Sequence, residues 1–153
     1  MGTSIVIPYF KIIDLDKDIT FSPKYYSDKG FLLQNEYRQA LEKSNILSDF
    51  SFLVGEAGTK SHLFYNQTGV IKNNLKYDLN LQGVKGDNYL KTYKLLNSSP
   101  LITDDNLLLS NFDISWNNSN TSFDNSSKCM KIFLEATMID INTFYLNLIL
   151  EKI

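Results

Sequence analysis

The stretch LKYDLNLQ, Leu75–Gln82, decides the fold class. Its apolar and polar side chains alternate at every position, and a β-strand points successive side chains to opposite faces of a sheet. A helix would mix the two kinds of side chain around its circumference. The stretch therefore predicts a strand with one apolar face and one polar face.

Segments with a similar alternation precede and follow this one. They are Asp18–Tyr26, Phe31–Arg38, Ile46–Val54 and Leu107–Trp116. Turn-forming residues separate them, as in Ser27-Asp28-Lys29-Gly30. A shorter strand is expected over Ser61–Gln67, ending at Gly69. This order predicts an all-β fold built as an antiparallel meander rather than from βαβ units.

Composition excludes several classes of function. The 153 residues carry 15 basic and 17 acidic side chains, a balance that predicts no nucleic-acid partner. The single cysteine, Cys129, and the single histidine, His62, cannot build a disulfide or a zinc site. Because no nucleophile–base pair or phosphate-binding loop is evident, we expect neither an enzyme nor a cofactor. The start of the sequence lacks the features of a secretory signal.

Strands with one apolar face have two physical interpretations. The apolar face packs against a second sheet in a soluble β-sandwich, or it faces lipid while the polar face lines a wet lumen. In a sandwich Leu75, Tyr77, Leu79 and Leu81 would lie between two sheets about 10 Å apart. In part of a barrel they would stay bare on a single curved sheet. Alternation alone leaves both interpretations open.

A family resemblance favours the barrel. The segment Ile5–Arg38 contains a Pro-Tyr-aromatic strand, a strand with Thr-x-x-Pro-Lys, a turn ending in glycine, and a strand closing on Glu-Tyr-Arg. The residues that carry this pattern are Pro8, Tyr9, Phe10, Thr20, Pro23, Lys24, Gly30, Glu36, Tyr37 and Arg38. In order and spacing they resemble the start of the barrel in the lipopolysaccharide-assembly protein LptD (OstA) family. Asp87–Tyr93 resembles a later segment more weakly.

The resemblance implies a fragment of a larger outer-membrane protein. Residues 1–13 would form the junction with a jelly-roll domain and the first barrel strand, and residues 14–128 a partial, unclosed outer-membrane β-barrel sheet. The family implies transport of lipopolysaccharide into the outer leaflet, with a plug lipoprotein and periplasmic bridge proteins as partners. The full-length protein would reside in the cell outer membrane. The alternative is a soluble β-sandwich adhesin or carbohydrate-binding module that uses exposed tyrosines and Trp116.

The resemblance also assigns candidate site residues. Pro8 and Pro23 match the lateral gate, where proline weakens strand pairing because it has no N–H to donate. Glu36 and Arg38 are candidates for the lumen face.

Residues 129–153 differ in character from the rest of the chain. Their alternation is lost and a long apolar run appears, which predicts an atypical tail. Another reading frame of a plausible coding sequence gives a string closer to the family, so we interpret the tail as out of frame and Cys129 as having no role. The coding DNA tests this hypothesis.

Overall fold

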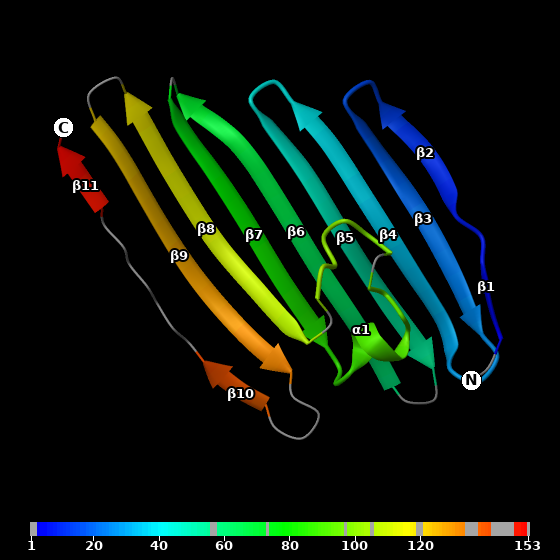
Figure 1. Cartoon of the computed structure of the whole chain (residues 1–153). Coiled ribbons are helices and arrows are strands. Elements are labelled where there is room, and N and C mark those ends of the chain that lie inside the picture. Colours follow the sequence, from blue (N-terminus) through cyan, green and yellow to red (C-terminus); the bar gives the residue numbers. More distant parts are fainter. Residues whose placement is uncertain are drawn as a thin grey trace.

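The computed structural model describes residues 3–55, 58–72, 74–96, 98–104, 106–118, 121–133, 138–141 and 149–152. Its strands form one sheet in the order β1-β3-β4-β5-β6-β7-β8-β9-β10 (Figure 1). The bounds are β1 Ser4–Val6, β2 Tyr9–Asp14, β3 Lys17–Tyr26, β4 Gly30–Leu41, β5 Ser44–Gly55, β6 Gly58–Lys72, β7 Leu75–Lys85, β8 Leu107–Asn118, β9 Thr121–Phe133, β10 Met138–Ile141 and β11 Ile149–Lys152. β2 also pairs with β3, and β11 also pairs with β9.

Every described strand pair is antiparallel, and from β2 to β9 each strand pairs with the next along the chain. Short turns make most of these connections, such as Glu42–Lys43 between β4 and β5. No ladder joins the two outer edges within the described residues, so the sheet is open. The predicted all-β, antiparallel and unclosed meander is confirmed.

The two faces of the sheet differ sharply in polarity. Register places Gln34 beside Ser51 on one face and Leu33 beside Phe52 on the other, as the alternation predicted. The side chains of what we call the apolar face are Ile19, Phe21, Tyr25, Phe31, Leu33, Tyr37, Phe50, Phe52, Val54, Leu63, Tyr65, Leu75, Tyr77, Leu79, Leu81, Phe112, Ile114 and Trp116. We call the opposite side the polar face.

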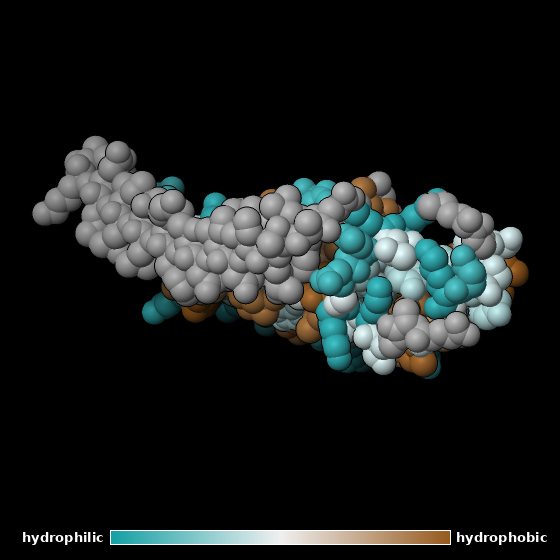
Figure 2. All heavy atoms as spheres, turned by 90° about the horizontal axis from the view of Figure 1, so that it is seen from below, coloured by the Kyte–Doolittle hydropathy of each residue, from teal (hydrophilic) through white to brown (hydrophobic). Residues whose placement is uncertain are grey.

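The apolar face is bare in the described part of the chain. Val54 is 62% exposed, Leu63 56% and Leu81 46%, values that packing under a second sheet would not allow. Figure 2 shows hydrophobic side chains along the lower border of the molecule and hydrophilic ones on the end that faces the viewer. A single layer with an uncovered apolar side is what the barrel interpretation predicts.

A connection between β7 and β8 covers part of the polar face. We call residues 86–96, 98–104 and 106 the docked loop; it contains the short helix α1, Tyr89–Thr92, and lies across the sheet in Figure 1. The buried hydrophobic core is formed by this loop and the strands beneath it. Its members are Leu32, Leu53, Phe64, Tyr89, Leu90, Tyr93, Leu95, Ile102 and Leu108. The core therefore lies on the polar side of the sheet.

One local prediction was wrong. β6 does not end at Gly69 but continues to Lys72, and Gly69 pairs with Tyr77 of β7. The aromatic ring of Tyr77 occupies the space that a side chain at Gly69 would fill, which lets a glycine sit inside a strand.

Strand structure continues into the tail. β9 runs through Cys129, and the described parts of residues 134–153 are the strands β10 and β11, both paired with β9. These pairings belong to the amino-acid sequence as it stands, so they do not test whether residues 129–153 are translated out of frame. The out-of-frame hypothesis, like the boundary between residues 13 and 14, stays a prediction.

Candidate functional site

The first candidate site is the seam, the ladder that joins β1 and β2 to β3. Val6 lies opposite Lys24 and Tyr9 opposite Phe21, so both strands keep one register along β3. They are two halves of one edge strand, interrupted at Ile7 and Pro8. The edge strand is apolar and exposed, with Ile7 and Ile12 each 68% exposed.

Both candidate gate prolines lie at the interruption. The backbone N–H of Ile7 donates to the carbonyl of Pro23 at 3.3 Å, so Ile7 and Pro23 are a hydrogen-bonding pair. Such a pair normally exchanges two bonds, but Pro23 has no N–H to return. The backbone N–H and C=O groups of successive residues in a strand point to opposite sides, so the backbone nitrogen and carbonyl of Pro8 point away from β3. Pro23 therefore removes a bond within the seam, whereas Pro8 removes a donor at the outer edge.

Glu36 and Arg38 both lie on the polar face of β4. The Arg38 Nε donates to the Asp18 carboxylate of β3 at 2.9 Å and lies 3.8 Å from a Glu36 carboxylate oxygen. The guanidinium carbon of Arg38 is also 5.9 Å from the ring centre of Phe10 on the edge strand. Arg38 thus bridges the seam, and the assignment of this face to a lumen stays a prediction.

An open cleft lies beside these residues on the polar face. Its volume is about 680 Å³, and its walls combine apolar Phe10, Ile12 and Leu47 with charged Asp18 and Arg38. Apolar and charged walls in one cleft suit a ligand that has both kinds of surface.

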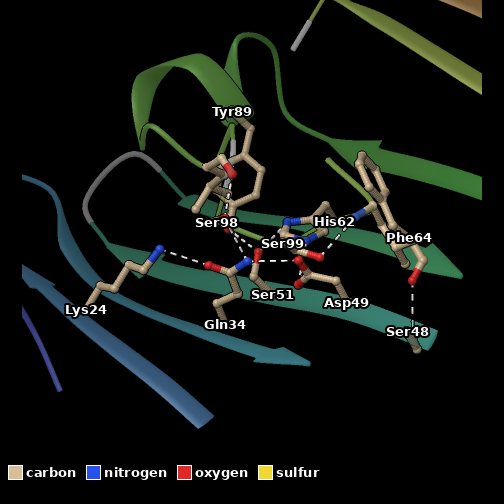
Figure 3. A network of polar contacts seen from close by, with 12 residues as sticks. Lys24, Gln34, Ser48, Asp49, Ser51, His62, Phe64, Tyr89, Ser98 and Ser99 are labelled. Atoms are coloured by element: carbon tan, nitrogen blue, oxygen red, sulfur yellow. Dashed lines mark hydrogen bonds and ion pairs between the residues drawn. The ribbon is translucent and has the colours of Figure 1, made fainter. Parts of the chain in front are cut away.

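The second candidate site is a hydrogen-bonded network beneath the docked loop (Figure 3). His62 of β6 lies between two side chains of β5: its Nδ1 is 2.6 Å from the Ser51 hydroxyl, and its Nε2 is 3.1 Å from the Asp49 carboxylate. Tyr89 of α1 reaches the same Ser51 hydroxyl at 2.7 Å. These four side chains are between 0% and 3% exposed.

Gln34 extends this network toward β3. Its amide nitrogen donates to the second Asp49 oxygen and to the Ser98 hydroxyl, each at 2.9 Å. Its amide oxygen accepts from the Lys24 ammonium at 2.8 Å. Ser98 and Tyr89 belong to the docked loop, so the network ties the loop to β3, β4, β5 and β6.

One assignment of protons satisfies the centre of the network. If neutral His62 carries its proton on Nε2, it donates to Asp49 and accepts from Ser51, which in turn accepts from Tyr89. Burial raises the pKa of Tyr89 to about 12, although the bond to Ser51 opposes the shift, so the phenol stays a donor at neutral pH.

Sequence reasoning missed this constellation of Ser51, His62 and Asp49. It contains the residue types of a hydrolytic triad, but a catalytic hydroxyl must reach a substrate. Ser51 is 2% exposed and holds the loop in place through Tyr89. In this conformation the cluster connects the loop to the sheet.

The described part of the chain holds no group of three or more His, Cys, Asp or Glu side chains placed to bind a metal ion. It also contains no helix that is both long and apolar enough to cross a membrane.

Two known proteins are similar to this chain, and both carry the same name. They are LPS-assembly proteins LptD. That of Idiomarina loihiensis is 27% identical over 97 residues, covering 60% of this chain, and that of Pseudoalteromonas atlantica is 25% identical over 88 residues, covering 54%. The matched part spans only 13% and 12% of those two proteins. No protein-family model matches the chain.

These matches agree with the resemblance found in the sequence. Because the match covers a small part of each relative, the activity and partners of the whole protein belong to the proposal that follows.

Proposed function

We propose that this chain is part of an outer-membrane β-barrel that carries lipopolysaccharide into the outer leaflet. The observation that carries the proposal is the single-layered sheet with an uncovered apolar face and a polar opposite face. A surface of exposed Val, Leu, Phe and Tyr is unfavourable in water but suits hydrocarbon, and a polar inner surface suits a wet lumen. The similarity to LptD proteins supports the same conclusion.

In this proposal the seam is the line along which the barrel wall parts. Proline at position 23 leaves the Ile7 pair with one hydrogen bond, so the strands separate there at a lower free-energy cost. The cleft beside the seam, with its apolar and charged walls, would receive a passing amphiphile. Pro8 and Pro23 would act as gate residues, and Glu36 and Arg38 as lumen-facing residues.

The role is structural and transport-related rather than catalytic. The plug lipoprotein and the periplasmic bridge proteins of the translocon are the partners that the family resemblance implies. An open sheet also needs further strands at its edges to span a bilayer, because unpaired backbone groups in hydrocarbon cost several kcal/mol each.

The single tryptophan tests whether the apolar face meets lipid. Trp116 lies on the apolar face of β8, while its neighbour Ser115 lies on the polar face. The chain would be refolded in micelles of a brominated detergent, in which bromine atoms quench tryptophan fluorescence on contact. We expect strong quenching of Trp116.

The matched control moves the tryptophan to the opposite face by combining Trp116→Phe with Ser115→Trp. We expect this variant to be quenched much less, because the polar face is turned away from the detergent tails. Equal quenching in both proteins, or stronger quenching in the control, would contradict the lipid-facing assignment and favour the soluble β-sandwich interpretation.

A further inference from the structure

A small cavity lies where the edge strand, the end of β3 and the docked loop meet. Its volume is about 250 Å³. Side chains of Val6, Lys24 and Tyr26 line it from the strands, Lys29 from the following turn, and Thr92 and Lys94 from the loop. We propose that this lysine pocket binds a phosphate group.

The charge of the pocket points to a dianion. Lys24, Lys29 and Lys94 supply three positive charges and Asp28 one negative charge, which leaves a balance of +2 among the lining side chains. A phosphate monoester carries a charge of about −1.5 to −2 at neutral pH. A carboxylate would neutralise only half of this excess, so phosphate fits the lining better.

The burial and incomplete hydrogen bonding of the Lys24 ammonium are the stronger argument for a phosphate site. Its side chain is buried, at 9% exposure, and its ammonium makes one hydrogen bond, to the neutral Gln34 amide. An ammonium has three protons to donate, and a buried charge without a counter-ion is costly. The Asp49 carboxylate attracts the Lys24 ammonium from the far side of Gln34, but it makes no direct contact with it. A bound phosphate would supply the missing acceptor oxygens.

The rest of the pocket is already positioned. The Tyr26 hydroxyl donates to the Tyr93 carbonyl at 2.9 Å, which fixes the loop segment 92–94 against β3. The Lys29 ammonium lies 5.5 Å from the ring centre of Tyr93 and is thereby held toward the cavity. The backbone of Lys94 has a φ of 51°, the left-handed conformation, which it adopts at the turn after α1. Little rearrangement is needed for an anion to bind, which favours affinity.

The phosphate could belong to a lipid headgroup or be free in solution. The pocket alone supports the phosphate chemistry, whereas a lipid source rests on the proposed transport function. Because Val6 of the edge strand lines the cavity, a lipid phosphate bound here would lie directly beside the seam.

Calorimetric titration of the full chain in dodecylmaltoside micelles tests the site. The probes are inorganic phosphate and mixed micelles that contain phosphatidic acid, with phosphatidylcholine micelles as the lipid control. Three variants are compared with the wild type: Lys24→Met removes the buried charge, Lys94→Asn removes a loop charge with a residue that tolerates a positive φ, and Lys128→Gln removes an exposed charge on β9.

We expect phosphate to bind and Lys24→Met to weaken it by roughly 10- to 100-fold, the effect of losing one charge-assisted hydrogen bond. Lys94→Asn should weaken it by a smaller factor while the circular dichroism spectrum stays unchanged, and Lys128→Gln should have no effect. Since protonation removes negative charge from a phosphate group as the pH falls, affinity should be lower at acidic pH than at neutral pH.

Each outcome has a distinct meaning. Tighter binding to phosphatidic acid than to free phosphate supports the site and its lipid source. Binding of free phosphate alone supports the site and counts against its use in lipid transport. Absence of phosphate binding, or equal losses in Lys94→Asn and Lys128→Gln, overturns the proposal, and neither result bears on the tryptophan quenching test.

Discussion

The seam at the N-terminal edge and the loop-covered centre of the sheet, β4 to β6, are stabilised differently. In the seam the ladder is interrupted at Ile7–Pro8, its register shifts between Ile12 and Asp14, and its apolar side chains are exposed. In the centre the ladder between β4 and β5 is unbroken, and a buried network adds side-chain bonds across three strands. The difference shows that one sheet can combine an edge that opens at low cost with a centre that resists opening.

Removing the aromatic ring at the centre of the network should have the largest effect. Tyr89→Ala deletes a fully buried ring and leaves Ser51 without its partner, which we expect to weaken docking of the loop by about 3–5 kcal/mol. Trypsin should then cleave the loop at Lys91 and Lys94 much faster than in the wild type. The control is Leu96→Ala, which removes an exposed side chain of the same loop. Equal cleavage rates in the two variants would show that docking of the loop does not depend on Tyr89.

Alkaline pH should weaken the same contact without a mutation. An exposed tyrosine ionises near pH ~10, whereas burial raises the pKa of Tyr89 to about 12. A pKa raised by folding means that the stabilisation is complete below pH ~10 and is lost as the pH rises to about 12. The loss should approach roughly 2–3 kcal/mol, since each pKa unit corresponds to about 1.4 kcal/mol.

Thermal unfolding between neutral and alkaline pH, followed by circular dichroism, measures this loss. The matched variant is Tyr89→Phe, which keeps the ring but cannot ionise. The stability of Tyr89→Phe should fall less over the same pH interval. Its tyrosinate absorbance should also lack the one phenol, that of Tyr89, which ionises near the top of this pH range. Parallel pH profiles for the two proteins would assign the effect to other groups.

Two glycine-to-alanine substitutions test whether the centre of the sheet also depends on packing on the apolar face. A Cβ at Gly69 would lie 2.7 Å from a ring carbon of Tyr77, so Gly69→Ala should destabilise the chain by about 1–3 kcal/mol. A Cβ at Gly83 of β7 would come no closer than 3.9 Å to its nearest neighbour, so Gly83→Ala should change stability by less than ~0.5 kcal/mol. Urea unfolding compares the two variants, and the comparison fails if Gly83→Ala costs as much.

Alternation in the sequence predicted the sheet and its two faces because each strand has a period of two. Glu36 and Arg38 could be placed on the polar face for this reason, since Leu32 and Gln34 precede them at the same spacing. The sequence predicts a strand end at Gly69 because glycine is typical of turns. Its compensation by Tyr77 depends on pairing with another strand, which no local pattern contains.

The buried network was missed because its members are distant in the sequence, yet part of it could have been found. Asp49 and Ser51 lie two residues apart and so share one face of β5. The pairing of Gly55 with Gly58 sets the register of the β5–β6 hairpin and places His62 opposite Ser51. No pattern in the sequence predicts that Tyr89 contacts Ser51, because that contact depends on how the docked loop folds back over the sheet.

The smallest effect concerns the seam itself. Pro23→Ala restores an N–H that can donate to Ile7, so the pair would exchange two hydrogen bonds in place of one. We expect the seam to gain about 0.5–1.5 kcal/mol. Amide hydrogen exchange at Ile7 should slow accordingly, while exchange at Leu53 in the centre serves as the internal reference.

The direction of the missing donor makes this prediction specific. Pro8→Ala also restores an N–H, but it points away from β3 and should leave exchange at Ile7 unchanged. Pro100→Ala, in the exposed part of the docked loop, controls for the general effect of replacing proline. If Pro8→Ala slows Ile7 as much as Pro23→Ala does, then the rigidity of the proline ring, rather than a missing hydrogen bond, weakens the seam. The two prolines would then act alike, and the contrast between an inward and an outward donor would have no consequence for opening.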